Sequence, residues 1–122
     1  MTTLTQVILY VSDPARSSSF YAEILGLTPK SLSPNFAIFE LAQGVQLGLL
    51  LRSTVEPAAD KGISSELCLI VDSKEALEAL HKQWAGRGMR IILPPQLMYF
   101  GAVNFMAEDA DGNRIRVSTP DK

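Results

Sequence analysis

The chain has 122 residues, of which 47% are hydrophobic and 20% charged, with a formal net charge of −2. This composition is typical of one globular domain, and the slight negative charge argues against nucleic acid as a partner, because phosphate binding requires a basic surface. The sequence has no apolar run near the roughly 20 residues of a membrane helix, and its single cysteine, Cys68, excludes an internal disulfide.

The first half predicts a strand, a helix and two further strands. Residues 7–11 are apolar and form the first strand. Asp13 followed by Pro14 is a helix start signal, since Asp caps a helix and Pro fits its first position. Gly26 then ends the helix. The remaining strands of this half are predicted at residues 37–41 and 45–51, with a short turn at Gln43 and Gly44.

The second half predicts the same order of elements. A strand at residues 66–71 is followed by Asp72 and Glu75, whose spacing is that of a capping box at a helix start. The apolar face of this helix is predicted to carry Leu77, Leu80, His81 and Trp84. The later strands are predicted at residues 90–93, 103–107 and 114–117.

Residues 94–101 interrupt these strands and are predicted as a loop, because they begin with two prolines. Met98, Tyr99 and Phe100 follow the prolines and precede Gly101. Three large apolar side chains are poor choices for a loop in water. They therefore predict either a lid or stacking wall over a ligand, or a contact with a second subunit.

The two halves are copies of one unit. Val11 matches Val71, and Gly44 matches Gly112, with the insertion between them falling near the proline pair. Internal duplication of this kind predicts a repeated architecture. The chain is therefore interpreted as a single domain, residues 1–122, built from a module at residues 1–52, a linker at 53–64 and a module at 65–122.

Three motifs in this order resemble the vicinal oxygen chelate superfamily, which contains glyoxalase I, bleomycin-resistance proteins and extradiol dioxygenases. They are LYVSD at residues 9–13, SFY with LGL at 19–21 and 25–27, and DADGNRI at 109–115, where Ala110 replaces the family's Pro. The resemblance implies an α+β fold. Two tandem βαβββ modules would form a curved mixed sheet around a cleft, with the helices outside.

The resemblance also implies four metal-ligand positions, at Gln6, Gly48, Glu66 and Arg116. The offset that relates Val11 to Val71 relates Gln6 to Glu66 in the same way. A divalent site needs three or four His, carboxylate or thiolate ligands, whereas glycine offers no side chain and Arg116 would repel a cation. We therefore expect no functional metal and no cofactor.

Alternation along the strands predicts which residues share the face of the implied cleft. Arg116 would bind an anionic group of a ligand, or form an ion pair with Glu66. Glu66 is a candidate general base, or the partner in that ion pair. Cys68 is interpreted as a buried apolar filler. The predicted ligand-binding residues are Arg116, Glu66, Gln6, Tyr10, Gln46, Arg114, Tyr99 and Phe100.

The resemblance and the degenerate metal positions favour a metal-independent binding protein of the bleomycin-resistance type. It would sequester a partly anionic or aromatic small molecule and form a homodimer. The alternatives are a glyoxalase- or dioxygenase-like enzyme (a lyase, isomerase or oxygenase) with a rebuilt site, and a regulatory module that recognises a protein. Neither nucleic acid nor membrane is expected as a partner. The absence of a signal peptide pattern at residues 1–6, together with the single cysteine, predicts a cytoplasmic protein.

Overall fold

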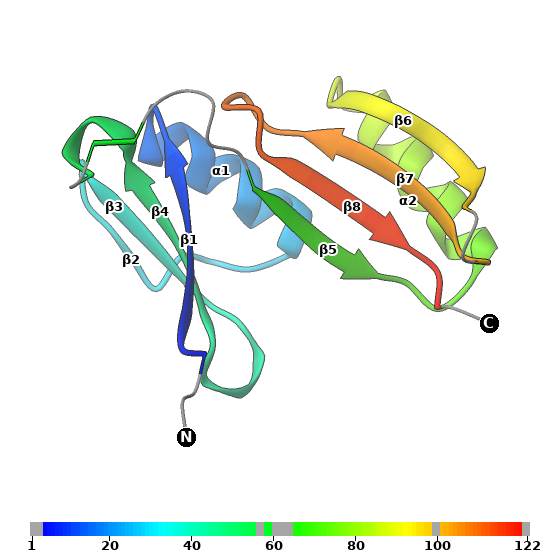
Figure 1. Cartoon of the computed structure of the whole chain (residues 1–122), viewed down its shortest axis with the longest axis horizontal. Coiled ribbons are helices and arrows are strands. Elements are labelled where there is room, and N and C mark those ends of the chain that lie inside the picture. Colours follow the sequence, from blue (N-terminus) through cyan, green and yellow to red (C-terminus); the bar gives the residue numbers. More distant parts are fainter. Residues whose placement is uncertain (1–3, 56–57, 60–64, 99–100, 121–122) are drawn as a thin grey trace. The chain divides into compact units, whose positions relative to one another are not determined.

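The computed structural model describes residues 4–55, 58–59, 65–98 and 101–120. The chain divides into two units, Met1–Ile63 (unit 1) and Ser64–Lys122 (unit 2). Within the described residues, each unit contains one four-stranded mixed sheet and one α-helix (Figure 1). The α+β class and the two tandem βαβββ modules predicted from the sequence are therefore confirmed. Neither helix in the described residues has the length and apolar character needed to cross a membrane.

Unit 1 has the strand order β1-β4-β3-β2. The strands β1 and β4, first and last along the chain, pair in parallel, and the other pairs are antiparallel. Its elements are β1 (Gln6–Val11), α1 (Pro14–Leu25), β2 (Ser31–Leu32), β3 (Phe36–Glu40) and β4 (Gln46–Leu51), with 3₁₀ turns at Ala42–Gly44 and Arg52–Thr54. The strand β2 was not predicted, because two exposed residues are too few to show alternation.

Unit 2 has the equivalent strand order β5-β8-β7-β6. Its elements are β5 (Glu66–Ile70), α2 (Lys74–Gly86), β6 (Arg90–Leu97), β7 (Val103–Glu108) and β8 (Arg114–Ser118). The registers of the two units agree: Ile8 pairs with Gly48, and Cys68 pairs with Arg116. These are the pairs that the sequence offsets between the halves require.

The helix starts differ in how well the sequence predicted them. Asp13 caps α1 by accepting hydrogen bonds from the N–H groups of Ala15 and Arg16, at 3.1 and 3.2 Å. The cap of α2 is Ser73 and not Asp72, since the Ser73 hydroxyl accepts from the N–H of Ala76 at 3.1 Å. The predicted capping box was therefore one residue too early.

The proline pair lies in a strand and not in a loop. The strand β6 runs through Pro94 and Pro95 to Leu97, with shifts of register on both sides of Leu93. It is an edge strand, where a missing N–H costs no ladder hydrogen bond on the outer side. This prediction was wrong because proline excludes only a central strand.

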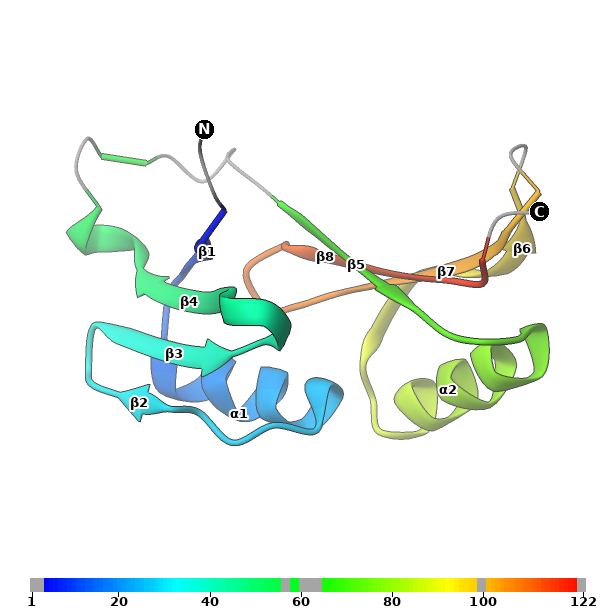
Figure 2. The same cartoon turned by 90° about the horizontal axis from the view of Figure 1, so that it is seen from below.

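Each helix packs against one face of the sheet in its own unit (Figure 2). The helix and the sheet together form the core of each unit. Its buried side chains include Leu9, Val11, Tyr21, Phe39 and Leu49 in unit 1, and Leu77, Trp84, Phe105, Ile115 and Val117 in unit 2. Burial of each large side chain contributes roughly 1.5–3 kcal/mol. We call the opposite side of each sheet its distal face, and it carries the residues of the other parity.

Candidate functional site

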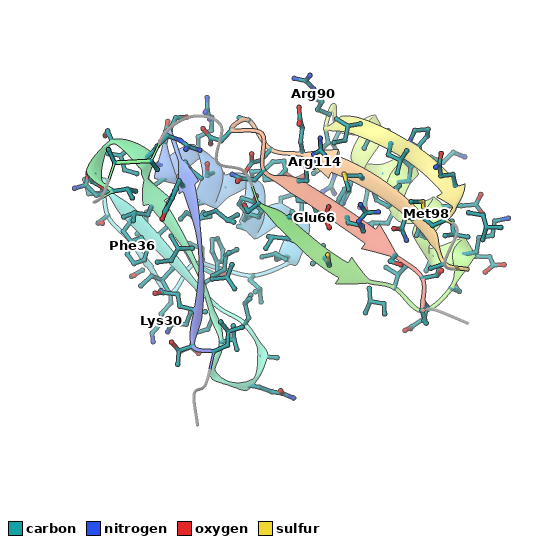
Figure 3. The ribbon with its side chains drawn as sticks, in the orientation of Figure 1. Lys30, Phe36, Glu66, Arg90, Met98 and Arg114 are labelled. Carbon is teal, nitrogen blue, oxygen red and sulfur yellow. The ribbon has the colours of Figure 1, made fainter. Side chains whose placement is uncertain are left out.

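The distal face of unit 2 brings charged and polar side chains together around Arg116. This residue lies on β8, paired with Cys68 on β5 and with Met106 on β7. Glu66 lies two residues before Cys68 on β5 and pairs with Arg114 (Figure 3). The predicted parity of Glu66, Arg114 and Arg116 is therefore correct, and the three side chains share one surface.

Arg116 and Glu66 form a two-point ion pair. Nε of Arg116 donates to Oε2 of Glu66, and Nη2 donates to Oε1, both at 3.3 Å. The guanidinium lowers the pKa of the Glu66 carboxyl, chiefly through this hydrogen bond, while partial burial opposes it and the charge of Arg114 assists it. Glu66 is therefore ionised at neutral pH and is a weak candidate for a general base.

The other end of Arg116 is held from within the fold. Nη1 donates to Oδ1 of Asn104 at 2.7 Å, and Asn104 is fully buried. The Asn104 amide donates to the Ser118 hydroxyl at 2.7 Å, which in turn donates to the carbonyl of Thr119 at 2.7 Å. The amide nitrogen of Asn104 is used as the donor to Ser118, so the amide oxygen is the atom that faces Arg116.

The turn before β8 is held by hydrogen bonds that fix the start of this strand and so the position of Arg116. The carboxylate of Asp109 accepts from the backbone N–H groups of Asp111 and Asn113, each at 2.9 Å, and from the Asn113 amide at 3.0 Å. Gly112 has φ +84°, a conformation that suits glycine. Ser65 donates to Asn113 at 2.8 Å and ties the start of β5 to the same turn.

Cys68 is exposed and is not the buried filler that the sequence predicted. It lies on β5, an edge strand of the sheet, which its apolar neighbours could not indicate. Its thiol donates to Oε2 of Glu66 at 3.5 Å. Partial burial raises the pKa of the Cys68 thiol, and the Glu66 carboxylate raises it further. The thiol is thus a poor nucleophile near neutral pH.

The distal face of unit 1 is mainly apolar and aromatic. The Phe36 ring lies over Gly48, where a Cβ would come within 2.8 Å of the ring and 3.3 Å of Ile8. Tyr10 lies further along β1, with the Arg52 guanidinium 6.0 Å from its ring centroid. Arg52 also donates to the Tyr10 carbonyl at 3.3 Å.

The other predicted ligand-binding residues divide between the units. Gln6 and Gln46 pair with each other at the start of β1 and β4 in unit 1. Tyr99 and Phe100 lie outside the described residues.

The residues at the four implied metal positions do not fit a divalent ion. In unit 2 the Glu66 carboxylate is already paired with a guanidinium, and in unit 1 the Phe36 ring fills the space beside Gly48. Among the described residues, no three His, Cys, Asp or Glu side chains lie close enough together to hold a metal ion.

Two hollows lie elsewhere on unit 2. One of about 650 Å³ lies between the start of α2 and the ends of β6 and β8, where Ser73, Leu97 and Thr119 contribute to its lining. The other, of about 670 Å³, is beside the middle of α2 and includes His81 and Pro95. Neither hollow is lined by Glu66 or Arg116.

Two important residues were missed from the sequence. Asn104 has the distal-face parity on β7, and a polar residue among the apolar residues 103–107 was the available signal. Phe36 shares the face of Gly48, but its place over Gly48 follows from the pairing of Phe36 with Leu50, which the sequence pattern did not contain.

The whole fold matches a known family. Residues 3–117 match the model of the Glyoxalase/Bleomycin resistance protein/Dioxygenase superfamily, and the chain belongs to this superfamily. The resemblance drawn from the three sequence motifs is therefore confirmed.

Several relatives are similar over nearly the full length. The phenazine antibiotic resistance protein EhpR of Enterobacter agglomerans is 28% identical over 113 residues, which is 90% of this chain and 86% of that protein. An Agrobacterium tumefaciens protein solved by NMR is 37% identical, with a TM-score of 0.84 and 98% of each chain covered. A glyoxalase-related enzyme from Fulvimarina pelagi has the same fold, with a TM-score of 0.84, 17% identity and coverage of 98% of this chain and 89% of that one.

Proposed function

We propose that this protein binds and sequesters a planar, partly anionic small molecule without a metal ion. The observation that carries the proposal is Arg116, a partly exposed guanidinium fixed in direction by the buried Asn104. A cation held in one orientation loses little conformational freedom when it binds an anion, so more of the interaction appears as affinity. A guanidinium also offers the planar fork that recognises carboxylates.

The aromatic part of the proposed ligand is supported by one of the relatives. The similarity to a phenazine resistance protein supports a fused aromatic ligand, and resistance would then follow from removal of the free compound.

The proposal is tested by titrating the protein with phenazine and with phenazine-1-carboxylate. Binding is measured by calorimetry and by quenching of Trp84 fluorescence. We expect saturable, stoichiometric binding of the carboxylate, with the compound recovered unchanged after long incubation. Conversion of the compound at a rate that depends on Glu66 would instead support the enzyme alternative.

Arg116→Ala is expected to weaken binding of phenazine-1-carboxylate by about ten- to a hundredfold, because a hydrogen-bonded charge pair contributes roughly 1.5–3 kcal/mol. The matched control is Arg90→Ala, which removes the same charge from β6 at a residue that pairs with Glu108. Equal losses in the two variants would show that only net charge matters and would contradict the assigned role of Arg116.

A further inference from the structure

The two ends of the Arg116 guanidinium are held unequally. The bond to Asn104 is 2.7 Å long and is buried, whereas the two bonds to Glu66 are each 3.3 Å. Charge-assisted N–H···O bonds are usually about 2.7–2.9 Å long, so the contacts to Glu66 are loose. The Glu66 side chain is also 37% exposed, against 25% for Arg116. The inner end is therefore anchored and the outer edge is held weakly.

The outer edge has the shape of a carboxylate site. Its Nε–H and Nη2–H groups point the same way, and Glu66 presents one oxygen to each of them. A planar group with two coplanar oxygens matches this arrangement, while a neutral ring nitrogen or a single hydroxyl satisfies only one donor. The resident side chain thus defines the kind of group that this edge accepts.

We propose that Glu66 is an internal carboxylate that occupies the Nε–Nη2 edge of Arg116, and that a ligand binds by replacing it with a carboxylate of its own. This inference rests on the proposed function and narrows its ligand class to planar aromatic carboxylates. Glu66 sets the specificity, because a neutral ligand such as phenazine, whose acceptors are ring nitrogens, has no group that can take over both hydrogen bonds.

The exchange is feasible because no charge is left buried without a partner. One carboxylate replaces another on Arg116, so the guanidinium stays paired throughout. Glu66 leaves from β5, an edge strand, and moves towards water. Arg114 pairs with Glu66 across β5 and β8 and offers the displaced carboxylate a second cation. The Cys68 thiol also lies beside Glu66 and donates to its carboxylate.

Glu66 competes with the ligand for the Nε–Nη2 edge of Arg116. The observed affinity is therefore the intrinsic affinity multiplied by the fraction of molecules in which this edge is free. Removing the carboxylate should therefore strengthen binding of a carboxylate ligand, although the altered residue lies in the binding site. A residue that contacted the ligand favourably would give the opposite result.

The experiment measures the affinities of phenazine-1-carboxylate and of phenazine for Glu66→Gln and Glu66→Ala. Both variants are expected to bind the carboxylate about fivefold more tightly, the scale of a partly exposed ion pair. Affinity for neutral phenazine should change less than twofold. Circular dichroism confirms that each variant is folded, and the alanine variant guards against a residual hydrogen bond from glutamine.

Glu108→Gln is the matched control, because Glu108 lies in register with Arg114 on the other side of β8 and carries the same charge. It should leave the ratio of the two affinities unchanged, since it does not touch the fork of Arg116.

Two different failures are distinguishable. If neither compound binds the unaltered protein, the proposed function fails and the inference fails with it. If both bind, but the Glu66 variants leave the ratio unchanged, lower it, or match Glu108→Gln, the inference is overturned while the proposed function stands.

Discussion

Glu66 influences two neighbours of opposite chemistry, the Arg116 guanidinium and the Cys68 thiol. Both contacts favour the ionised carboxylate and lower the pKa of Glu66. The pKa of the Cys68 thiol is raised first by partial burial and then by the Glu66 carboxylate. A thiol beside a carboxylate is disfavoured as an anion. Cys68 is therefore a native reporter of the charge on residue 66.

Glu66→Gln is expected to lower the pKa of Cys68 part of the way towards the ordinary value for cysteine. The remaining shift reflects partial burial, which is the larger cause and is unaffected by the substitution. Because the reactive species is the thiolate, alkylation by iodoacetamide should accelerate at a lower pH in the variant than in the unaltered protein. The measurement is the alkylation rate as a function of pH, followed by mass spectrometry.

Glu75→Gln, in the first turn of α2, is the control and should leave the alkylation profile of Cys68 unchanged. An unchanged or higher thiol pKa in Glu66→Gln would contradict the contact between Glu66 and Cys68.

At the scale of elements, the centre of unit 1 depends on the close fit between β3 and β4. Gly48 is buried on β4, and the Phe36 ring from β3 covers it. The backbone of Gly48 does not have a positive φ, so the requirement for glycine comes from space and not from conformation. Figure 3 labels Phe36 on this sheet.

Gly48→Ala is expected to destabilise the protein by about 1 kcal/mol, since a Cβ forces the ring to move and overpacking costs roughly 1–3 kcal/mol. The lower figure applies because the contacts are with the outer end of the ring. Urea unfolding measures the change. In a double-mutant cycle, Phe36→Ala should remove most of the cost.

Gly86→Ala is the matched control, because Gly86 ends α2 and a Cβ there would meet nothing within 4 Å. It should be neutral or slightly stabilising, as alanine is the better helix former. Equal destabilisation by both substitutions would contradict the steric account of Gly48.

Elements with local signals were predictable from the sequence, and those that depend on position in a sheet were not. Asp13, Pro14 and Gly26 gave the bounds of α1 because caps act over one turn. The strand through Pro94 and the exposure of Cys68 both depend on edge positions in the sheet. Strand order is set by pairing between distant segments, so short-range patterns did not contain it.

The site was predictable in part for the same reason. Alternation placed Glu66, Arg114 and Arg116 on one face, and the ion pair between Arg116 and Glu66 was one of the two predicted alternatives. Alternation could not show that Arg116 also reaches inwards to Asn104. That direction depends on side-chain rotamers and on the buried hydrogen bonds of Ser118.

At the scale of the whole molecule, the edge strands present apolar side chains to solvent. Leu32 on β2 is 53% exposed, and Leu97 on β6 is 70% exposed. Exposed edges with large apolar residues tend to associate, and a symmetric pair of chains is the commonest way to cover them. This supports the homodimer that we propose from the sequence.

The protein is expected to have twice the 13.3 kDa mass of the chain in light scattering coupled to size-exclusion chromatography. Leu97→Lys and Leu32→Lys place a charge on each edge in turn, and at least one of them should shift the mass towards that of the monomer. Ala79→Lys on α2 is the control. A monomer at all concentrations up to the millimolar range would disprove the dimer.

The matched registers of the two units give this molecule a built-in reference for experiments on either half. Gly48 and Arg116 occupy equivalent positions, each paired with an equivalent residue of the first strand in its unit. A substitution on the distal face of β1, β3 or β4 therefore has a counterpart on β5, β7 or β8 with the same strand pairing. Comparing the two members of such a pair separates what a side chain does from what its place in the sheet does, within a single polypeptide.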